Sequence, residues 1–297
     1  MESDRDRAEG RRAGYGQRRG SARDCRDSIL KRIALILAGG AGTRLRPLSS
    51  DENPKQFLRI FDGCSLLEKT FARVRRSVAS VYISTSEQYA EKCAQQLGIV
   101  NILTEPSRRN NAPAITLCCH EIEAREGDVV IAVLPSDHFI RDEAEFGRVL
   151  DRAFEFAEAN DYLVTIGIKA TEPNTAYGYL HLGDELEPGV IAVQRFLEKP
   201  SRERAEEFMR RGNYAWNAGI FVWRASVFRS EIAHAAPEIA AVTRQNYQQM
   251  PSISIDYALM EKAPRVAAIR GDFGWSDVGS FEALERVGVD VAALLNR

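Results

Sequence analysis

From residue 29 onward, the apolar and polar residues of this chain follow two distinct patterns. Short, almost continuous apolar runs rich in Val, Ile and Leu predict buried β-strands, and longer amphipathic segments predict helices. The strands are expected at residues 33–37, 81–85, 99–103, 129–134 and 163–168, and the helices at 66–76, 89–97, 114–124 and 143–159. Because such strands alternate with helices, we expect a parallel sheet that helices cover on both faces.

Residues 177–196 break this alternation. Gly178, Gly183, Pro188 and Gly189 separate strand-like pieces in this stretch, which predicts a small antiparallel insertion. No internal repeat and no Gly/Ser-rich linker divides the chain. The pattern therefore favours one α/β domain with a Rossmann-like, mostly parallel mixed sheet, in which ligands bind beyond the carboxyl ends of the strands.

The first 28 residues differ from the rest in composition. They contain eight arginines, six acidic residues and almost no apolar ones, so we expect residues 1–28 to form a disordered polar arm. The six acids make a nucleic-acid-binding or mitochondrial targeting arm the weaker interpretation. The folded domain is expected over residues 29–285, followed by a short tail at 286–297.

Composition and charge exclude several classes of function. The 297 residues are 44% hydrophobic and carry a formal net charge of −2, a balance typical of a globular protein and not of a nucleic-acid binder. No apolar run approaches the roughly 20 residues of a membrane helix. The five cysteines show no C-x-x-C spacing, so neither a disulfide framework nor a zinc site is expected, and a reducing cytoplasm fits best.

A glycine-rich segment directly follows the first predicted strand. Three glycines within four positions would let successive backbone N–H groups point at an anion. A Rossmann fingerprint would require a further glycine in place of Leu45, and a Walker A motif would require Gly-Lys-Ser/Thr in place of Thr43, Arg44 and Leu45. Because Arg44 and Lys55 supply positive charge nearby, the segment predicts a polyphosphate-binding loop of another kind.

This loop is the first of several short motifs between residues 32 and 284. They are G-x-G-x-R-x-x-P-L at 40–48, P-K-Q-F-L at 54–58, E-P at 105–106 with N at 110 and A-P-A at 112–114, L-P-S-D-H at 134–138, Y-G-Y at 177–179, F-L-E-K-P at 196–200, W-N-A-G at 216–219, P-S-I-S-I-D-Y at 251–257 and G-W-S-D-V-G at 274–279. With these motifs in this order, the chain resembles the sugar-1-phosphate nucleotidyltransferases. The P-K-Q-F-L and W-S-D-V-G forms favour the mannose-1-phosphate guanylyltransferase (GDP-mannose pyrophosphorylase) branch.

The resemblance implies a fold of the nucleotide-diphospho-sugar transferase type, with residues 29–285 as the catalytic domain. It also implies transfer of GMP from GTP to α-D-mannose 1-phosphate, which yields GDP-mannose and pyrophosphate by Mg²⁺-assisted in-line displacement. GTP and mannose 1-phosphate are then the expected partners, with no nucleic acid and no membrane. A homodimer is a further possibility that the sequence leaves open.

The resemblance also implies roles for residues at matching positions. Arg44 would contact the leaving pyrophosphate, Lys55 the α-phosphate and Lys199 the acceptor phosphate. Asp137 and Asp277 would hold Mg²⁺, since a carboxylate beside a triphosphate requires an intervening cation. The nucleotide-binding residues would be Leu37, Gly39, Gly40, Gly42, Thr43, Glu105, Asn110, Ala112 and Asp137, and the sugar-phosphate-binding residues Gly178, Glu198, Lys199 and Asn217.

Two departures from the family pattern leave alternatives open. Asn111 stands where relatives usually carry threonine, near the expected base pocket, and only about eighteen residues follow Gly279, where the family continues into a left-handed β-helix. We therefore expect that extension to be absent or vestigial. Two alternatives to a mannose-1-phosphate guanylyltransferase therefore stay open. One is a catalytically weak or silent regulatory homologue that binds GDP-mannose, and the other is a nucleotidyltransferase for another sugar 1-phosphate.

Overall fold

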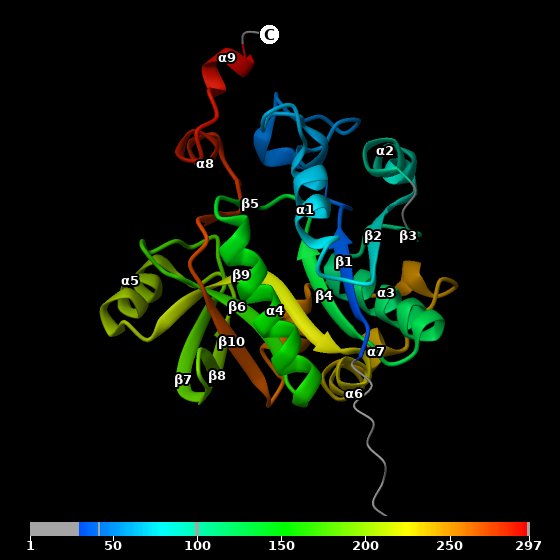
Figure 1. Ribbon diagram of the computed structural model, residues 1–297, viewed down its shortest axis with the longest axis vertical. Helices are drawn as coiled ribbons and strands as arrows, with labels where there is room; N and C mark the ends of the chain where they lie inside the picture. Colours follow the sequence, from blue (N-terminus) through cyan, green and yellow to red (C-terminus); the bar gives the residue numbers. More distant parts are fainter. Residues whose placement is uncertain (1–29, 41, 99–100, 296–297) are drawn as a thin grey trace, which may run out of the picture.

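One mixed sheet forms the centre of the molecule. The computed structural model describes residues 30–40, 42–98 and 101–295, so the arm predicted at 1–28 lies outside the described residues. The strands of the main sheet are β1 (Arg32–Leu37), β2 (Ser80–Ser86), β3 (Asn101–Glu105), β4 (Val130–Pro135), β6 (Leu163–Lys169), β7 (Tyr179–Glu187), β8 (Val190–Leu197), β9 (Tyr214–Arg224) and β10 (Val266–Gly271). Their order across the sheet is β3-β2-β1-β4-β9-β6-β10-β8-β7 (Figure 1).

The directions of the strands divide this sheet into two parts. β1, β2, β3 and β4 run parallel to one another, which confirms the parallel arrangement predicted for this region. β9 lies between β4 and β6 and is antiparallel to both. The apolar pattern predicts neither β9 nor β10. Asn217 and Gly219 interrupt the apolar run of β9, and β10 is short and rich in alanine.

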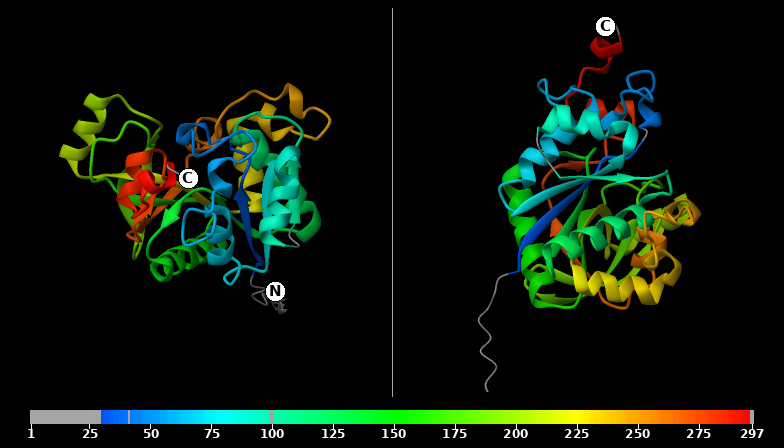
Figure 2. Two further views of the ribbon diagram at one scale, coloured as in Figure 1. Left: turned by 90° about the horizontal axis from the view of Figure 1, so that it is seen from above. Right: turned by 90° about the vertical axis from the view of Figure 1, so that its right-hand side faces the viewer.

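Helices cover both faces of the sheet. The α-helices of the described residues are α1 (Leu66–Val74), α2 (Glu87–Leu97), α3 (Asn111–Glu126), α4 (Glu143–Ala159), α5 (Arg202–Arg211), α6 (Ala225–Ala235), α7 (Pro237–Ala240), α8 (Phe281–Arg286) and α9 (Val291–Leu295). Apolar residues of α1, α2 and α4 join one buried cluster, and those of α3, α6 and α7 join another on the opposite face (Figure 2). The four helices predicted from amphipathic periodicity correspond to α1 to α4.

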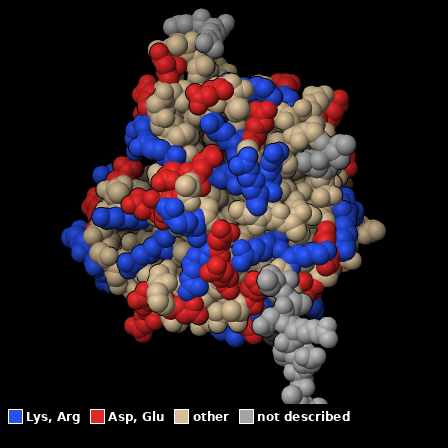
Figure 3. Space-filling view, viewed as in Figure 1, with Lys and Arg blue, Asp and Glu red and all other residues tan. Residues whose placement is uncertain are grey.

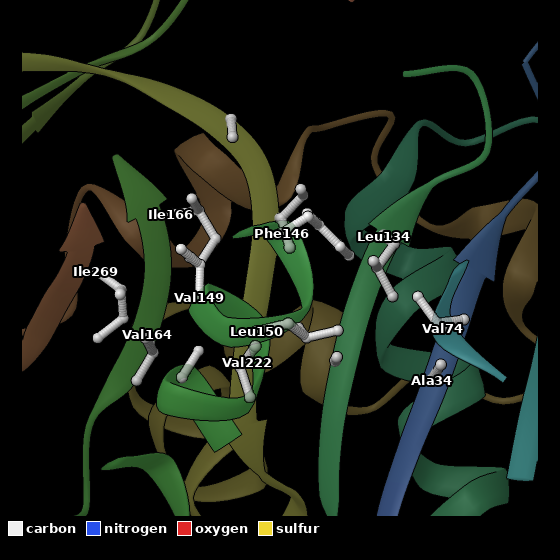
Figure 4. Close-up of a cluster of buried hydrophobic side chains, with 14 of the residues drawn as sticks. Ala34, Val74, Leu134, Phe146, Val149, Leu150, Val164, Ile166, Val222 and Ile269 are labelled. Atoms are coloured by element: carbon white, nitrogen blue, oxygen red, sulfur yellow. The ribbon is translucent and has the colours of Figure 1, made fainter. Parts of the chain in front are cut away.

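Strand β1 shows how the alternation of side chains builds these two layers. Ala34 and Ile36 belong to the cluster that contains Phe146 of α4, and part of this cluster is drawn in Figure 4. Ile33 and Leu35 point the other way and belong to the cluster under α3. Because all four side chains are fully buried, β1 is apolar on both faces, as expected for a central parallel strand.

The antiparallel insertion predicted at residues 177–196 is confirmed. β7 and β8 form an antiparallel hairpin. β8 also pairs with β10, and β7 pairs with the start of β9. The hairpin is therefore an extension of the main sheet, and it carries the residues that precede β7 and follow β8 to the carboxyl ends of the parallel strands.

A second, two-stranded sheet joins two distant parts of the chain. β5 (Phe139–Ile140) pairs in antiparallel fashion with β11 (Trp275–Ser276). β5 begins two residues after Asp137, and β11 ends one residue before Asp277. This pairing brings Asp137 and Asp277 to the same part of the molecule, although 140 residues separate them in the sequence.

The C-terminal helices pack against the glycine-rich loop. Leu284 of α8 and Val291 of α9 share a buried cluster with Leu45 and Val278, and Figure 1 shows α8 and α9 on the side of the sheet where β1 ends. The domain boundary predicted at residue 285 stays a prediction. The cluster nevertheless makes residues 281–291 part of the packing beneath the loop.

On the face in Figure 3, positive and negative side chains are interspersed. Within the described ranges, no helix combines the length and the apolar character needed to cross a membrane.

Candidate active site

The glycine-rich loop begins at the carboxyl end of β1. Gly39 lies against the side chain of Glu105, so a Cβ added there would be 2.6 Å from Glu105 Oε1. Gly42 has a φ of +60° and lies so close to the backbone of Lys55 that a Cβ would be 2.5 Å from its nitrogen. Gly40 instead has open space around it and lines a cavity. The first and third glycines are therefore required by packing, and the middle one exposes its backbone to a ligand.

Gln56 fixes the path of this loop. Its Nε2 donates hydrogen bonds to the carbonyl oxygens of Ala38 and Gly40, both at 2.9 Å. Ser49 Oγ donates to the carbonyl of Gly42 at 2.6 Å. Because these bonds occupy the carbonyl groups, the loop can present N–H groups to an anion. Gln56 is a functional residue that the sequence analysis did not assign, although it lies within the P-K-Q-F-L motif.

A cavity of about 370 Å³ lies beside the loop. Leu37, Gly39, Gly40, Glu105, Asn110 and Asp137 of the predicted nucleotide set line it, together with Arg108, Arg109 and Asn111. Thr43 belongs to a short 3₁₀ turn, Thr43–Leu45, after the loop. Ala112 lies in the first turn of α3, where its N–H donates to the carbonyl of Ile253 at 3.2 Å. The structure thus brings most of the predicted nucleotide set together around one cavity.

Glu105 is a partly buried acid that lines this cavity. Its Oε2 accepts a hydrogen bond from the hydroxyl of Tyr247 at 3.1 Å. Burial raises the pKa of the Glu105 carboxyl, while the Tyr247 hydroxyl and the charge of Arg108 oppose that rise. Tyr247 itself is fully buried, so it fixes the carboxylate in one orientation. Tyr247 carries no motif signal, because the segment around it is irregular.

Lys55 is the buried cation of the site. Its Nζ lies 2.8 Å from Asp137 Oδ2 and donates to the backbone carbonyls of Asp277 at 2.6 Å and Val278 at 3.3 Å. The Lys55 side chain is only 5% exposed. All three N–H groups of the ammonium are therefore used within the protein, and the predicted contact of Lys55 with a phosphate stays a prediction.

The Asp277 carboxylate is held by its own neighbours. Its Oδ1 accepts hydrogen bonds from the Tyr177 hydroxyl at 3.0 Å and the Gly279 N–H at 3.2 Å, and its Oδ2 lies 3.8 Å from Arg44 Nη1. Val278, which lies between Asp277 and Gly279 in the sequence, has a φ of 47°, a conformation that β-branched residues rarely adopt. The Arg44 side chain is 66% exposed, so it can turn from Asp277 to a ligand.

The charges of this centre shift the pKa values of their neighbours. Burial opposes the charged form of Asp137, but the Lys55 ammonium and the other polar contacts of this carboxyl together outweigh burial and hold its pKa below the usual value. Burial lowers the pKa of His138 to about 4, so its ring is neutral at pH 7. His138 Nδ1 accepts a hydrogen bond from Trp275 Nε1 at 3.1 Å, and the two rings pack edge to face.

A second cavity, of about 200 Å³, contains the predicted sugar-phosphate residues. Gly178, Glu198 and Asn217 line it, and a Cβ on Gly178 would lie 2.6 Å from Glu198 Oε2. Lys199 is not among the residues that line this cavity; it follows Glu198 in the chain, has a φ of 45° and pairs with the Glu198 carboxylate. Burial works to lower the pKa of Lys199, but its bond to Glu198 raises it overall.

The two cavities adjoin. Leu37, Asn111 and Pro135 line both of them. Asp137 faces the first cavity and Asp277 faces the second, while both residues contact the same ammonium. The site can therefore hold two ligands at once, with the carboxylate pair at their junction.

Comparison with known proteins agrees with this geometry. The nucleotidyl transferase family matches residues 33–293, and the chain belongs to this family. The xanthan biosynthesis protein XanB of Xanthomonas campestris pv. campestris (strain ATCC 33913) is 39% identical over 275 residues, which cover 85% of this chain and 58% of that protein. A mannose-1-phosphate guanylyltransferase of Sinorhizobium fredii is 38% identical over 286 residues, covering 87% of this chain and 55% of that protein.

A solved structure supports the same assignment. The crystal structure of a mannose-1-phosphate geranyltransferase from Thermus thermophilus shares 35% identity and a TM-score of 0.80, and the match covers 87% of this chain and 79% of that one. The predicted fold class is thereby confirmed. The chain spans less than two thirds of the length of the curated relatives it matches. Nucleotidyltransferases of this family generally use a divalent metal.

Gly39→Ala tests the packing between the glycine-rich loop and Glu105, which lines the cavity of about 370 Å³. The added methyl group would overlap Glu105 Oε1, so we expect a loss of about 1–3 kcal/mol in the free energy of unfolding and weaker binding of nucleoside triphosphate. Gly147→Ala is the matched control, because Gly147 lies within α4 with nothing within 4 Å of an added Cβ. That variant should gain about 0.5–1 kcal/mol. Denaturant unfolding and calorimetric titration measure both effects, and equal stability of the two variants would contradict this packing.

Proposed function

We propose that this protein transfers GMP from GTP to α-D-mannose 1-phosphate and releases GDP-mannose and pyrophosphate. The observation that carries this proposal is the pair of adjoining cavities with Asp137 and Asp277 at their junction. One cavity is bordered by a loop that can bind phosphates, and the other by an acid, an amide and a lysine suited to a sugar phosphate. Several curated relatives are named mannose-1-phosphate guanylyltransferase, which supports the same reaction.

Glu105 supports guanine as the base. Guanine presents two adjacent donors, N1–H and the N2 amino group, on one edge, and a carboxylate can accept from both with its two oxygens. Adenine, cytosine and uracil do not present this pair. Because Tyr247 fixes the Glu105 carboxylate in the cavity, a base without those donors would leave a buried acid unsatisfied, which costs binding energy.

The chemistry requires no covalent intermediate with the protein. An oxygen of the sugar phosphate attacks the α-phosphorus of GTP, a new P–O bond forms, and the bond from that phosphorus to the bridging oxygen breaks. Pyrophosphate departs with the electron pair. We assign Arg44 and the N–H groups at Gly40 to the charge of the leaving pyrophosphate, and Lys55 to the electrostatic balance at the α-phosphate. Lys199 would turn from Glu198 to the acceptor phosphate.

The carboxylate pair fits Mg²⁺. Both donors are hard oxygen ligands of the kind that Mg²⁺ takes one or two at a time, with phosphate oxygens and water completing its shell. Asp137 and Asp277 would be the protein ligands of this ion. When bound, the ion would neutralise charge on the phosphates of both substrates. The protein's own part is to hold both residues at Lys55, which contacts the carboxylate of Asp137 and the backbone carbonyl of Asp277.

We further propose a reducing, cytoplasmic environment for this enzyme. Cys93, Cys118 and Cys119 are free and buried. Burial raises the pKa of the Cys118 thiol to about 12, so this group is protonated and unreactive. Such thiols need no oxidising compartment.

A substrate panel tests the proposed function. Purified protein would be incubated with Mg²⁺, mannose 1-phosphate or glucose 1-phosphate, and GTP, ITP, ATP, UTP or dTTP, and pyrophosphate release would be measured. We expect GTP with mannose 1-phosphate to give the highest kcat/KM. ITP, which lacks the 2-amino group, should lose roughly tenfold or more. Binding of GDP-mannose without turnover of any pair would contradict an enzyme and favour a regulatory protein.

The variants Asp137→Asn and Asp277→Asn test the carboxylate pair. Each removes a negative charge and keeps the size of the side chain, so we expect folded proteins with roughly a hundredfold lower kcat and a higher requirement for Mg²⁺. The double variant should lose far less than the product of the two single losses, because the residues act as one unit. Asp184→Asn, on the exposed part of β7, is the control. Independent, multiplicative losses would contradict a shared ion.

A further inference from the structure

The acceptor cavity contains a second acid, Asp256, that the reaction described above does not use. Asp256 is the first residue of a short helical segment, Asp256–Met260, and is only 9% exposed. It lines the same cavity as Glu198 and Asn217. Asn217 Nδ2 donates a hydrogen bond to Asp256 Oδ1 at 3.3 Å. The acid thus lies inside the proposed sugar site and not on the surface beside it.

The hydrogen bonds of Asn217 show which groups of its side-chain amide are free to bind a ligand. Its Oδ1 accepts from Thr165 Oγ1 at 2.8 Å and from the Gly219 N–H at 3.1 Å, which fixes the orientation of the amide. One N–H of the amide bonds Asp256, so a single N–H remains to bind a ligand. The amide oxygen is already occupied by the Thr165 and Gly219 donors. Among the side chains close to this amide, Glu198 and Asp256 are the acids that can accept hydrogen bonds from sugar hydroxyls.

Nothing in the described part of the chain neutralises Asp256 directly. The nearby lysine, Lys199, pairs with Glu198, and no ion pair involves Asp256 among the residues 30–40, 42–98 and 101–295. A buried carboxylate without a cation is unfavourable unless hydrogen bonds compensate. A hexose supplies several hydroxyl groups that can provide them.

We propose that Asp256 binds a hydroxyl group of the hexose in the acceptor cavity and so determines which sugar 1-phosphate is accepted. This inference rests on the proposed function, since it assumes that the acceptor is a sugar phosphate. Glu198 directly follows β8, whereas Asp256 begins the helical segment Asp256–Met260. They can therefore contact different hydroxyl groups of one ring, which is the arrangement that distinguishes epimers.

The charge of Asp256 responds to pH in the neutral range. Burial, together with the neighbouring charge of Glu198, raises the pKa of Asp256 to about 7. The charged or titratable groups around it are Glu198, Lys199, Tyr257 and Glu261 nearby and His138, Tyr177 and Asp277 across the cavity. Below pH 7 the carboxyl is neutral and can donate as well as accept. A sugar phosphate brings further negative charge, so the neutral form binds it better, and kcat/KM for the acceptor should fall as pH rises through 7.

The test combines variants of Asp256 with deoxy sugars. Asp256→Ala and Asp256→Asn would be assayed with GTP, Mg²⁺ and mannose 1-phosphate or its 2-, 3-, 4- and 6-deoxy analogues. We expect Asp256→Ala to lower kcat/KM roughly tenfold or more with mannose 1-phosphate, and much less with the one analogue that lacks the contacted hydroxyl. KM for GTP should not change. Asp184→Asn, an exposed aspartate of β7, is the matched control.

Asp256→Asn guards against a variant that fails to fold. It mimics the neutral acid, so we expect kcat/KM within about threefold of the wild type at pH 6 and no fall from pH 6 to 8 beyond that of the substrate phosphate. Equal losses with all analogues, or an unchanged pH profile in Asp256→Asn, would overturn the role of Asp256 while the wild type remains active. A wild type inactive with GTP and mannose 1-phosphate would instead overturn the proposed function.

Discussion

The ammonium group of Lys55 holds the site together. It lies 2.8 Å from the carboxylate of Asp137 and donates to the backbone carbonyls of Asp277 and Val278. It therefore joins three segments: the turn after the glycine-rich loop, the end of β4 and the segment after β11. In a water-poor environment, a lone ammonium or carboxylate would be unfavourable, so these groups stabilise one another only as a set. The geometry of both cavities depends on this set.

The rest of the fold supports the same arrangement. The parallel strands β1 and β4 end side by side, so that the loop and Asp137 meet at one edge. The pairing of β5 with β11 brings Asp277 to that edge. Leu284 and Val291 pack beneath the loop with Leu45. The two cavities, which we propose to bind the nucleotide and the acceptor, consequently share a wall, as direct transfer between two bound substrates would require.

Much of this could be predicted from the sequence, and the exceptions have physical reasons. The apolar runs and the Gly-Pro punctuation located β1, β4 and the β7–β8 hairpin, because periodicity reports burial directly. β9 was missed because Asn217 and Gly219, which serve the acceptor cavity, interrupt its apolar pattern. Tyr247 and Asp256 were not assigned because their roles depend on contacts with distant residues, Glu105 and Asn217. Such contacts leave no local signal in a single sequence.

The central claim is that both substrates bind together and react directly across the carboxylate pair. The stereochemical course at the α-phosphorus tests this claim most directly. The protein would be supplied with GTP carrying sulfur in one configuration at the α-phosphorus, together with mannose 1-phosphate, and the configuration of the resulting thio-GDP-mannose would be determined. One direct displacement predicts inversion at phosphorus. Retention would mean two displacements through a covalent enzyme intermediate, and it would contradict the account.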